Sequence, residues 1–110
     1  HDRTMAVASH LPQMVATALM LTAGDRANGL AGPALREMTR LAASPGVLWT
    51  ELAQHVKPAL IGELQSLKSY LTEIEMAVHF GEKLDKWFDR ANGLRKGLDM
   101  AQVAKPAQAP

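Results

Sequence analysis

The sequence predicts an all-α fold: a helical bundle built around one long helix whose apolar seam must be covered. Three observations predict it. The chain is rich in alanine and leucine and contains six methionines, residue types that favour helices. Aromatic residues, which are enriched in the strands of sandwiches and barrels, make up only 5% of the chain. Apolar residues recur at spacings of three and four along most of its length, which is the period of a helix face.

Length and composition restrict the class of protein further. The 110 residues suffice for one domain, expected over residues 1–100, with residues 101–110 as a disordered tail. Apolar residues make up 47% of the chain and the formal net charge is +1, which excludes a highly charged disordered protein. The same balance gives no pattern for binding polyanions, so no nucleic-acid partner is expected.

The absence of certain residues and segments bears on the compartment of the protein and on membrane association. It has no cysteine, which excludes disulfides, zinc-thiolate sites and cysteine nucleophiles and suits a reducing cytoplasm. Its polar start does not resemble a signal peptide, and no run of about 18 apolar residues occurs, so no membrane partner is expected. Because the chain opens inside a helix without an initiator methionine, it suggests one domain of a longer protein.

The first half of the chain predicts two or three helices. The first is expected from about Asp2 to Ala23, and Pro12 inside it removes a backbone hydrogen bond and predicts a kink. Gly24 ends this helix, and a short second helix follows up to Leu30. A further short helix is expected over residues 34–43.

The clearest pattern is a near-heptad apolar seam of roughly eight helical turns. A helix with this seam must pack along most of its length. Pro58 should kink it early, and Gly62 permits close approach of a neighbour. The seam consists of Trp49, Ala53, Val56, Leu60, Leu64, Leu67, Leu71, Ile74 and Val78.

A final helix is expected after the seam, from about Glu82 to Leu98, with Gly81 ending the helix before it. One hexapeptide, Asp-Arg-Ala-Asn-Gly-Leu, occurs twice, at residues 25–30 and 89–94. The residues around the two copies do not match, so we interpret the pair as a coincidence and not as a structural repeat.

The chain lacks the sequence motifs of most common cofactor sites and active sites. It contains no G-x-G-x-x-G, Walker loop, G-x-S-x-G or H-E-x-x-H, and therefore predicts no cofactor-binding residue and no catalytic residue of its own. The four histidines do not cluster at ligand spacing, so no metal site is expected.

A few polar residues lie at helix positions where the pattern predicts apolar residues. His10 and Gln13 are three positions apart and share one side of the helix beside Pro12. Arg40 lies between apolar positions near a helix end, where its guanidinium could bind a carboxylate through two hydrogen bonds. The residues alone leave simpler interpretations open: a buried histidine satisfied by the backbone, and an ordinary surface arginine.

Three short motifs occur in order along the first half of the chain. They are His1-Asp2-Arg3, then Ser9-His10-Leu11-Pro12, then Leu35 to Pro45 with Thr39-Arg40 inside it, followed four residues later by Trp49. Together they resemble the C-terminal helical domain of the prephenate and arogenate dehydrogenase family. The signatures of that family are an H-D pair, S-H-L-P-H, F-R-D-x-T-R-I-A-x-S-D-P and a tryptophan.

The resemblance implies an oxidoreductase of tyrosine and aromatic amino acid biosynthesis, which carries out NAD- or NADP-dependent oxidative decarboxylation. Prephenate or arogenate would be the substrate and tyrosine a candidate inhibitor. In the family, the cofactor is bound mainly by an N-terminal Rossmann domain, so this chain alone is not expected to be active. The helical domain would close the substrate cleft and form an intertwined homodimer.

The resemblance also implies roles for single residues. Arg40 matches the arginine of the T-R pair, which binds a substrate carboxylate, and His10 matches the first histidine of S-H-L-P-H at the cleft wall. Gln13 replaces the second histidine of that motif. A neutral amide cannot offer a cationic contact, and members of the family that favour arogenate often lack that histidine, so the resemblance gives weight to arogenate over prephenate. His1 matches the histidine of the H-D pair and is expected to help place the first helix.

Two rival interpretations come from other classes of protein. One is a non-catalytic helical association module, in which His10 and Arg40 are ordinary helix residues and the seam only makes a bundle or dimer. The other is a helix that lies on a membrane surface, and it is disfavoured because neither long helix has a lysine-rich polar face.

Overall fold

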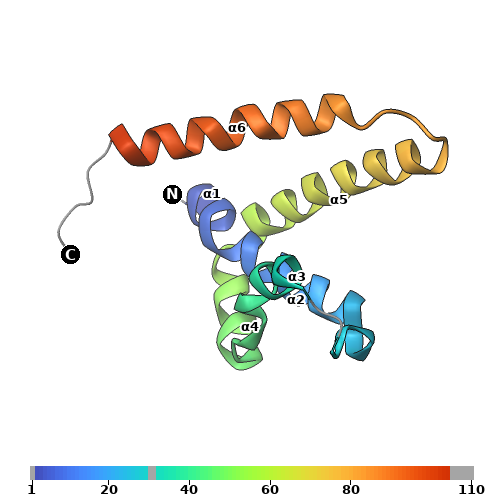
Figure 1. The fold of residues 1–110 in the computed structure, drawn as a ribbon. Coiled ribbons are helices and arrows are strands. Elements are labelled where there is room, and N and C mark those ends of the chain that lie inside the picture. The colour runs from blue at the N-terminus through green and yellow to red at the C-terminus, as the bar shows by residue number, and fades with distance from the viewer. Residues whose placement is uncertain (1, 30–31, 105–110) are drawn as a thin grey trace. The chain divides into compact units, whose positions relative to one another are not determined.

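The computed structural model describes residues 2–29 and 32–104 (Figure 1). Their regular structure is entirely helical, with no strand among the residues it describes, which confirms the all-α prediction. The chain divides into two compact units, His1–Leu67 and Lys68–Pro110. His1, which was expected to help place the first helix, lies outside the described residues.

The first unit opens with a helix that changes type beside a proline. α1 (Asp2–Met5) leads into a π-helical turn, η1 (Ala6–His10), and then α2 (Leu11–Ala23). Pro12 has no N–H and its ring crowds the carbonyl four residues earlier, so the regular helix cannot continue through it. The Leu11 N–H instead donates to the Ala6 carbonyl five residues back. The predicted irregularity is confirmed, and it takes the form of a π turn before the proline.

Short helices follow α2. They are η2 (Gly24–Ala27), α3 (Pro33–Met38) and η3 (Arg40–Ala43). A single helix over residues 34–43 was expected, but the backbone of Thr39 leaves the helical region, with φ −106° and ψ 6°. The second part therefore becomes the separate 3₁₀ turn η3, which packs against α2.

The seam is divided between two helices. α4 (Gly46–His55) ends at Val56, whose φ of −120° and ψ of 26° break the helix, and α5 (Lys57–His79) begins directly after it. Pro58 explains the position of the break, because proline is tolerated in the first turn of a helix but not in its interior. The early kink that Pro58 predicts is thus confirmed as a break.

The core of the first unit consists of small and branched apolar side chains. Ala6, Ala16, Val56 and Leu60 are buried in it. The two polar residues of the candidate site, His10 and Gln13, are buried as well.

One stretch of the first unit, Ala6–Ala27, is long and apolar enough to cross a membrane by length and composition. The sequence has no unbroken apolar run, so no such stretch was expected. The core helix of a soluble protein and a signal sequence pass the same test.

The second unit is a helical hairpin made by the end of α5 and by α6 (Asp85–Ala104), which run antiparallel (Figure 1). Gly81 adopts φ +67° and makes the turn possible. Its N–H donates to the Val78 carbonyl at 3.2 Å, and the Glu82 N–H donates to the Ala77 carbonyl at 2.8 Å. These two bonds form a Schellman motif, which satisfies the last carbonyls of α5.

The last helix differs from its predicted range at both ends. α6 begins at Asp85, whose carboxylate in the first turn suits the positive end of the helix dipole, rather than at Glu82. It continues to Ala104 instead of ending near Leu98. Residues 101–104 are therefore helical where a tail was expected, because nothing in Ala101 to Ala104 breaks a helix and the first proline comes at position 106.

Candidate functional site

The candidate site lies in the first unit, where the π turn η1 meets α4. His10 ends η1 and is only 7% exposed, and its ring meets the ring of Trp49 edge to face, with centroids 5.5 Å apart. His10 Nδ1 and Trp49 Nε1 are both buried and neither has a hydrogen-bond partner among the described residues. Two buried polar atoms without partners are costly, so this wall of the site is polar and unsatisfied.

Gln13 is one helical turn after His10, and its amide is fully used. Its Nε2 donates to the Leu41 carbonyl at 2.8 Å, and its Oε1 accepts from Ser44 Oγ at 3.3 Å. Nε2 also lies 3.4 Å from Thr17 Oγ1. The side chain is 4% exposed, so it connects α2 to η3 from inside the first unit. Helical periodicity could not reveal this contact, because Gln13 and Leu41 are 28 residues apart.

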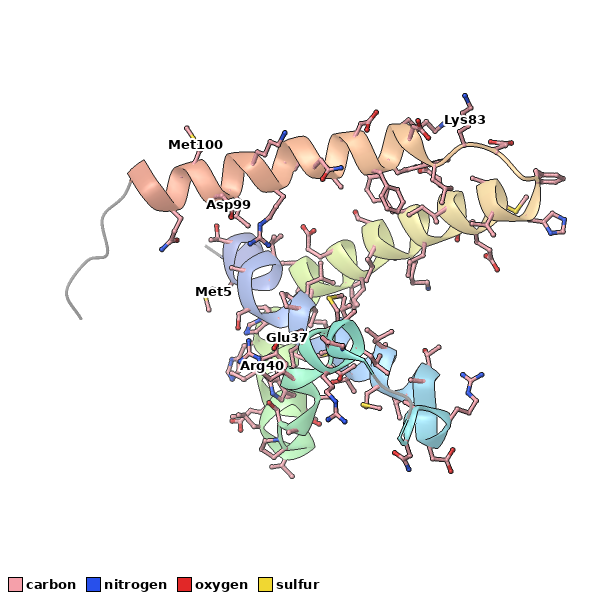
Figure 2. The ribbon with its side chains drawn as sticks, viewed as in Figure 1. Met5, Glu37, Arg40, Lys83, Asp99 and Met100 are labelled. Atoms are coloured by element: carbon pink, nitrogen blue, oxygen red, sulfur yellow. The ribbon has the colours of Figure 1, made fainter. Side chains whose placement is uncertain are left out.

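Arg40 is the first residue of η3 and is exposed. Figure 2 labels it close to Glu37, which lies one turn earlier at the end of α3. Within residues 2–29 and 32–104, the Arg40 guanidinium makes no hydrogen bond or ion pair. A planar guanidinium that is exposed and unpaired is available to a carboxylate, which it can bind through two parallel hydrogen bonds.

The structure therefore brings some of the predicted residues together. Gln13 is bonded to the turn that begins with Arg40, and His10 shares a buried wall with Trp49. Sequence reasoning had placed Trp49 in the seam and in the family motif but not beside His10. Ser44 Oγ also donates to Gln13 Oε1. Sequence patterns gave no signal for that contact.

The described residues form neither a metal site of three or more ligands nor a glycine-rich nucleotide site. No three histidine or acidic side chains gather there at a spacing that could hold a metal ion. The glycines with positive φ, Gly24, Gly29 and Gly81, follow or end helices. A dinucleotide cradle needs such glycines between a strand and the start of a helix, so this part of the chain does not fit one.

The second unit contains a groove of about 560 Å³ between the end of α5 and the start of α6. Ile74, Ala91 and Leu94 contribute its apolar lining. Two hydrogen bonds cross between the helices: Trp87 Nε1 donates to Glu73 Oε1 at 3.0 Å, and Arg90 Nη1 donates to Tyr70 Oη at 3.4 Å. These bonds set the spacing of the hairpin and leave an apolar channel with polar edges.

Comparison with known proteins decides the family. The sequence profile described as "Prephenate dehydrogenase, dimerization domain" matches residues 1–98.

The chain belongs to this family.

The match covers nearly all the described residues, both the candidate site and the hairpin. It confirms the resemblance inferred from the ordered motifs.

Individual relatives agree with the family. The chain is 22% identical to a prephenate dehydrogenase of Lactococcus lactis subsp. cremoris over 96% of its own length and 32% of that protein. It is 26% identical to a prephenate dehydrogenase of Bacillus subtilis over 93% of its own length and 30% of that protein. The chain thus spans about a third of the length of these relatives.

A solved structure resembles the fold as well. The crystal structure of Synechocystis arogenate dehydrogenase matches with a TM-score of 0.81 and 28% sequence identity. The match covers 89% of this chain and 39% of that one. The helical architecture is therefore shared with a dehydrogenase named for arogenate, while the sequence relatives are named for prephenate.

Proposed function

We propose that this chain is the dimerisation and substrate-cleft domain of a cytoplasmic, NAD(P)-dependent prephenate or arogenate dehydrogenase. Membership of the family and the names of the relatives support the reaction class. Since the chain spans about a third of those relatives, the activity is that of a longer protein that contains it.

The observation that carries the proposal is the exposed guanidinium of Arg40, which is unpaired within the described residues. Substrates of this class are carboxylates, and an arginine held on a short turn meets a carboxylate with a fixed fork of donors. His10 and Trp49 would form a neighbouring polar wall, and their buried ring nitrogens have no partner among the described residues. In this role the chain binds and orients the substrate.

The nicotinamide cofactor would accept the hydride that the substrate loses. We assign its binding to another domain of the full protein, as the resemblance to the family implies. The choice between NAD and NADP is then made outside this chain.

The same chain would also form the homodimer, and exposed apolar side chains in the second unit support this. A monomer that leaves so many apolar side chains in water is expected to associate. Gly93 and Gly97 in α6 have open space around them among the described residues, which would permit a close approach of a second helix. The exposed apolar side chains include Leu71, Val78, Phe80, Phe88, Leu94, Leu98 and Met100.

Turnover by the full-length protein tests the proposal. The purified protein is supplied with prephenate or arogenate and with NAD or NADP, and formation of the reduced cofactor is followed by absorbance. We expect turnover of at least one of the two substrates. Absence of turnover with every combination, in a protein shown to be folded and dimeric, would support a non-catalytic association module instead.

A further inference from the structure

The side-chain amide of Gln13 is hydrogen-bonded within the protein. It is 4% exposed, and both atoms of its amide have partners: Nε2 donates to the Leu41 carbonyl, and Oε1 accepts from Ser44 Oγ. Making a direct bond to a substrate would require breaking the 2.8 Å bond to Leu41. The Leu41 carbonyl would then lose one of its two donors and keep only the Ser44 N–H.

Gln13 is hydrogen-bonded to η3, the turn that begins with Arg40. η3 is a single 3₁₀ turn, Arg40–Ala43, and a turn this short depends on contacts with the rest of the protein for its stability. The Leu41 carbonyl accepts the Gln13 amide at 2.8 Å and the Ser44 N–H at 3.3 Å. Gln13 is thus bonded to the residue directly after Arg40 and to the residue directly after the turn.

We propose that Gln13 is a positioning residue: its amide fastens η3 to α2 and thereby fixes the direction in which Arg40 presents its guanidinium to the substrate carboxylate. This inference rests on the proposed function of Arg40. It assigns Gln13 an effect on substrate binding that is transmitted through Arg40, in place of a contact with the substrate.

The chemistry of glutamine suits this role. The contact needs one donor for the Leu41 carbonyl and one acceptor for Ser44 Oγ, and a neutral amide supplies both from a single flexible stem. A carboxylate of the same shape has no donor and would set an oxygen against the Leu41 carbonyl. A methionine keeps the length of the side chain and removes both polar atoms.

The first test is a double-mutant cycle in the full-length enzyme. KM and kcat are measured for wild type, Gln13→Met, Arg40→Ala and the double variant, with Thr22→Val as the matched control. Thr22 lies on the same helix, nine residues after Gln13, and its hydroxyl donates to the Ala18 carbonyl at 2.8 Å, so the substitution removes a side-chain hydrogen bond that does not involve η3.

We expect Gln13→Met to raise KM about tenfold with little change in kcat, and to have no further effect once Arg40 is alanine. Ser44→Ala should raise KM less, in the same direction, and Thr22→Val should match wild type. If the effects of Gln13→Met and Arg40→Ala multiply in the double variant, Gln13 contacts the substrate directly and the inference is wrong. An unchanged KM in Gln13→Met would also overturn it.

The second test does not depend on activity. Amide hydrogen exchange of residues 40–44 is measured in the same full-length variants, and it should be about tenfold faster in Gln13→Met and Gln13→Glu than in Thr22→Val. Exchange as slow as in wild type would show that Gln13 does not fasten η3. If exchange is faster in these variants but the wild-type protein turns over neither substrate, the contact between Gln13 and η3 is supported and the proposed dehydrogenase function is refuted. The failure of the inference and the failure of the proposed function can therefore be told apart.

Discussion

At the scale of single residues, the first unit places polar groups inside a small core and satisfies only some of them. Gln13 is buried and fully bonded, whereas His10 Nδ1 and Trp49 Nε1 are buried without partners in the described part of the chain. Leaving a polar atom unpaired costs stability, and such a cost is commonly found where a site receives a ligand. The contrast separates a residue whose amide is bonded to η3 from two residues whose buried ring nitrogens have no partner among the described residues.

Replacing His10 tests this contrast. Leucine has a similar volume and carries no polar atom, so His10→Leu should keep the free energy of unfolding or raise it by about 1 kcal/mol. His10→Ala should lower it by about 2 kcal/mol, because it leaves a cavity beside Trp49. Both are measured by urea denaturation without substrate. A His10→Leu protein as unstable as His10→Ala would mean that Nδ1 has a partner in the folded protein.

Sequence reasoning predicted the residue types of the site better than their surroundings. Arg40 and His10 could be selected from motif and position, since both lie where a helix would favour apolar residues. The bonds from Gln13 to Leu41 and from Ser44 to Gln13 span 28 and 31 residues. Periodicity describes one helix at a time, so it says nothing about which turn a buried amide reaches.

At the scale of elements, local signals placed the helix ends well where a backbone constraint acts. Pro12 forces a π turn, Pro58 accompanies a break, and the turn at Gly81 closes α5 with two hydrogen bonds, one from the Gly81 N–H and one from the Glu82 N–H. Where no such backbone constraint acts, the surrounding sequence and tertiary structure determine the conformation of a segment. The hexapeptide Asp-Arg-Ala-Asn-Gly-Leu lies partly in η2 and the following turn in its first copy, and inside α6 in its second.

Gly81 provides a test at this scale. Because its φ of +67° is strained for any residue with a Cβ, Gly81→Ala should lower the free energy of unfolding by about 1 kcal/mol. Gly46→Ala is the control, since Gly46 starts α4 with ordinary backbone angles and open space around it. It should leave stability unchanged or slightly raised. Equal thermal midpoints for Gly81→Ala and wild type would contradict the assigned role of the turn.

At the scale of the whole molecule, the seam predicted from sequence is only partly covered within one chain. Val56 and Leu60 are buried, whereas Leu71 and Val78 are exposed. Spacing alone predicts that a seam must pack, but it does not say whether the partner is in the same chain. The uncovered part of the seam, together with the apolar side chains of α6, is the surface that we assign to the homodimer.

A charge on this surface should separate the dimer. Leu98 is 65% exposed on α6, and Leu98→Glu would bury a carboxylate in an apolar contact if a second copy covers it. We expect the dimer to dissociate at least tenfold more readily, as measured by sedimentation at several protein concentrations. Gln102→Glu places the same charge on an exposed polar position of α6 and should leave the dimer intact. An undisturbed dimer in Leu98→Glu would move the interface elsewhere.

The central claim is that Arg40 binds a substrate carboxylate, and equilibrium titration of the full-length protein with a prephenate analogue tests it most directly. Arg40→Ala should weaken binding by on the order of 2 to 4 kcal/mol, as expected for the loss of a charge-assisted contact. Arg36→Ala, which removes an exposed arginine from the neighbouring helix α3, should bind as wild type does. Equal affinity of wild type and Arg40→Ala for the analogue would contradict the account.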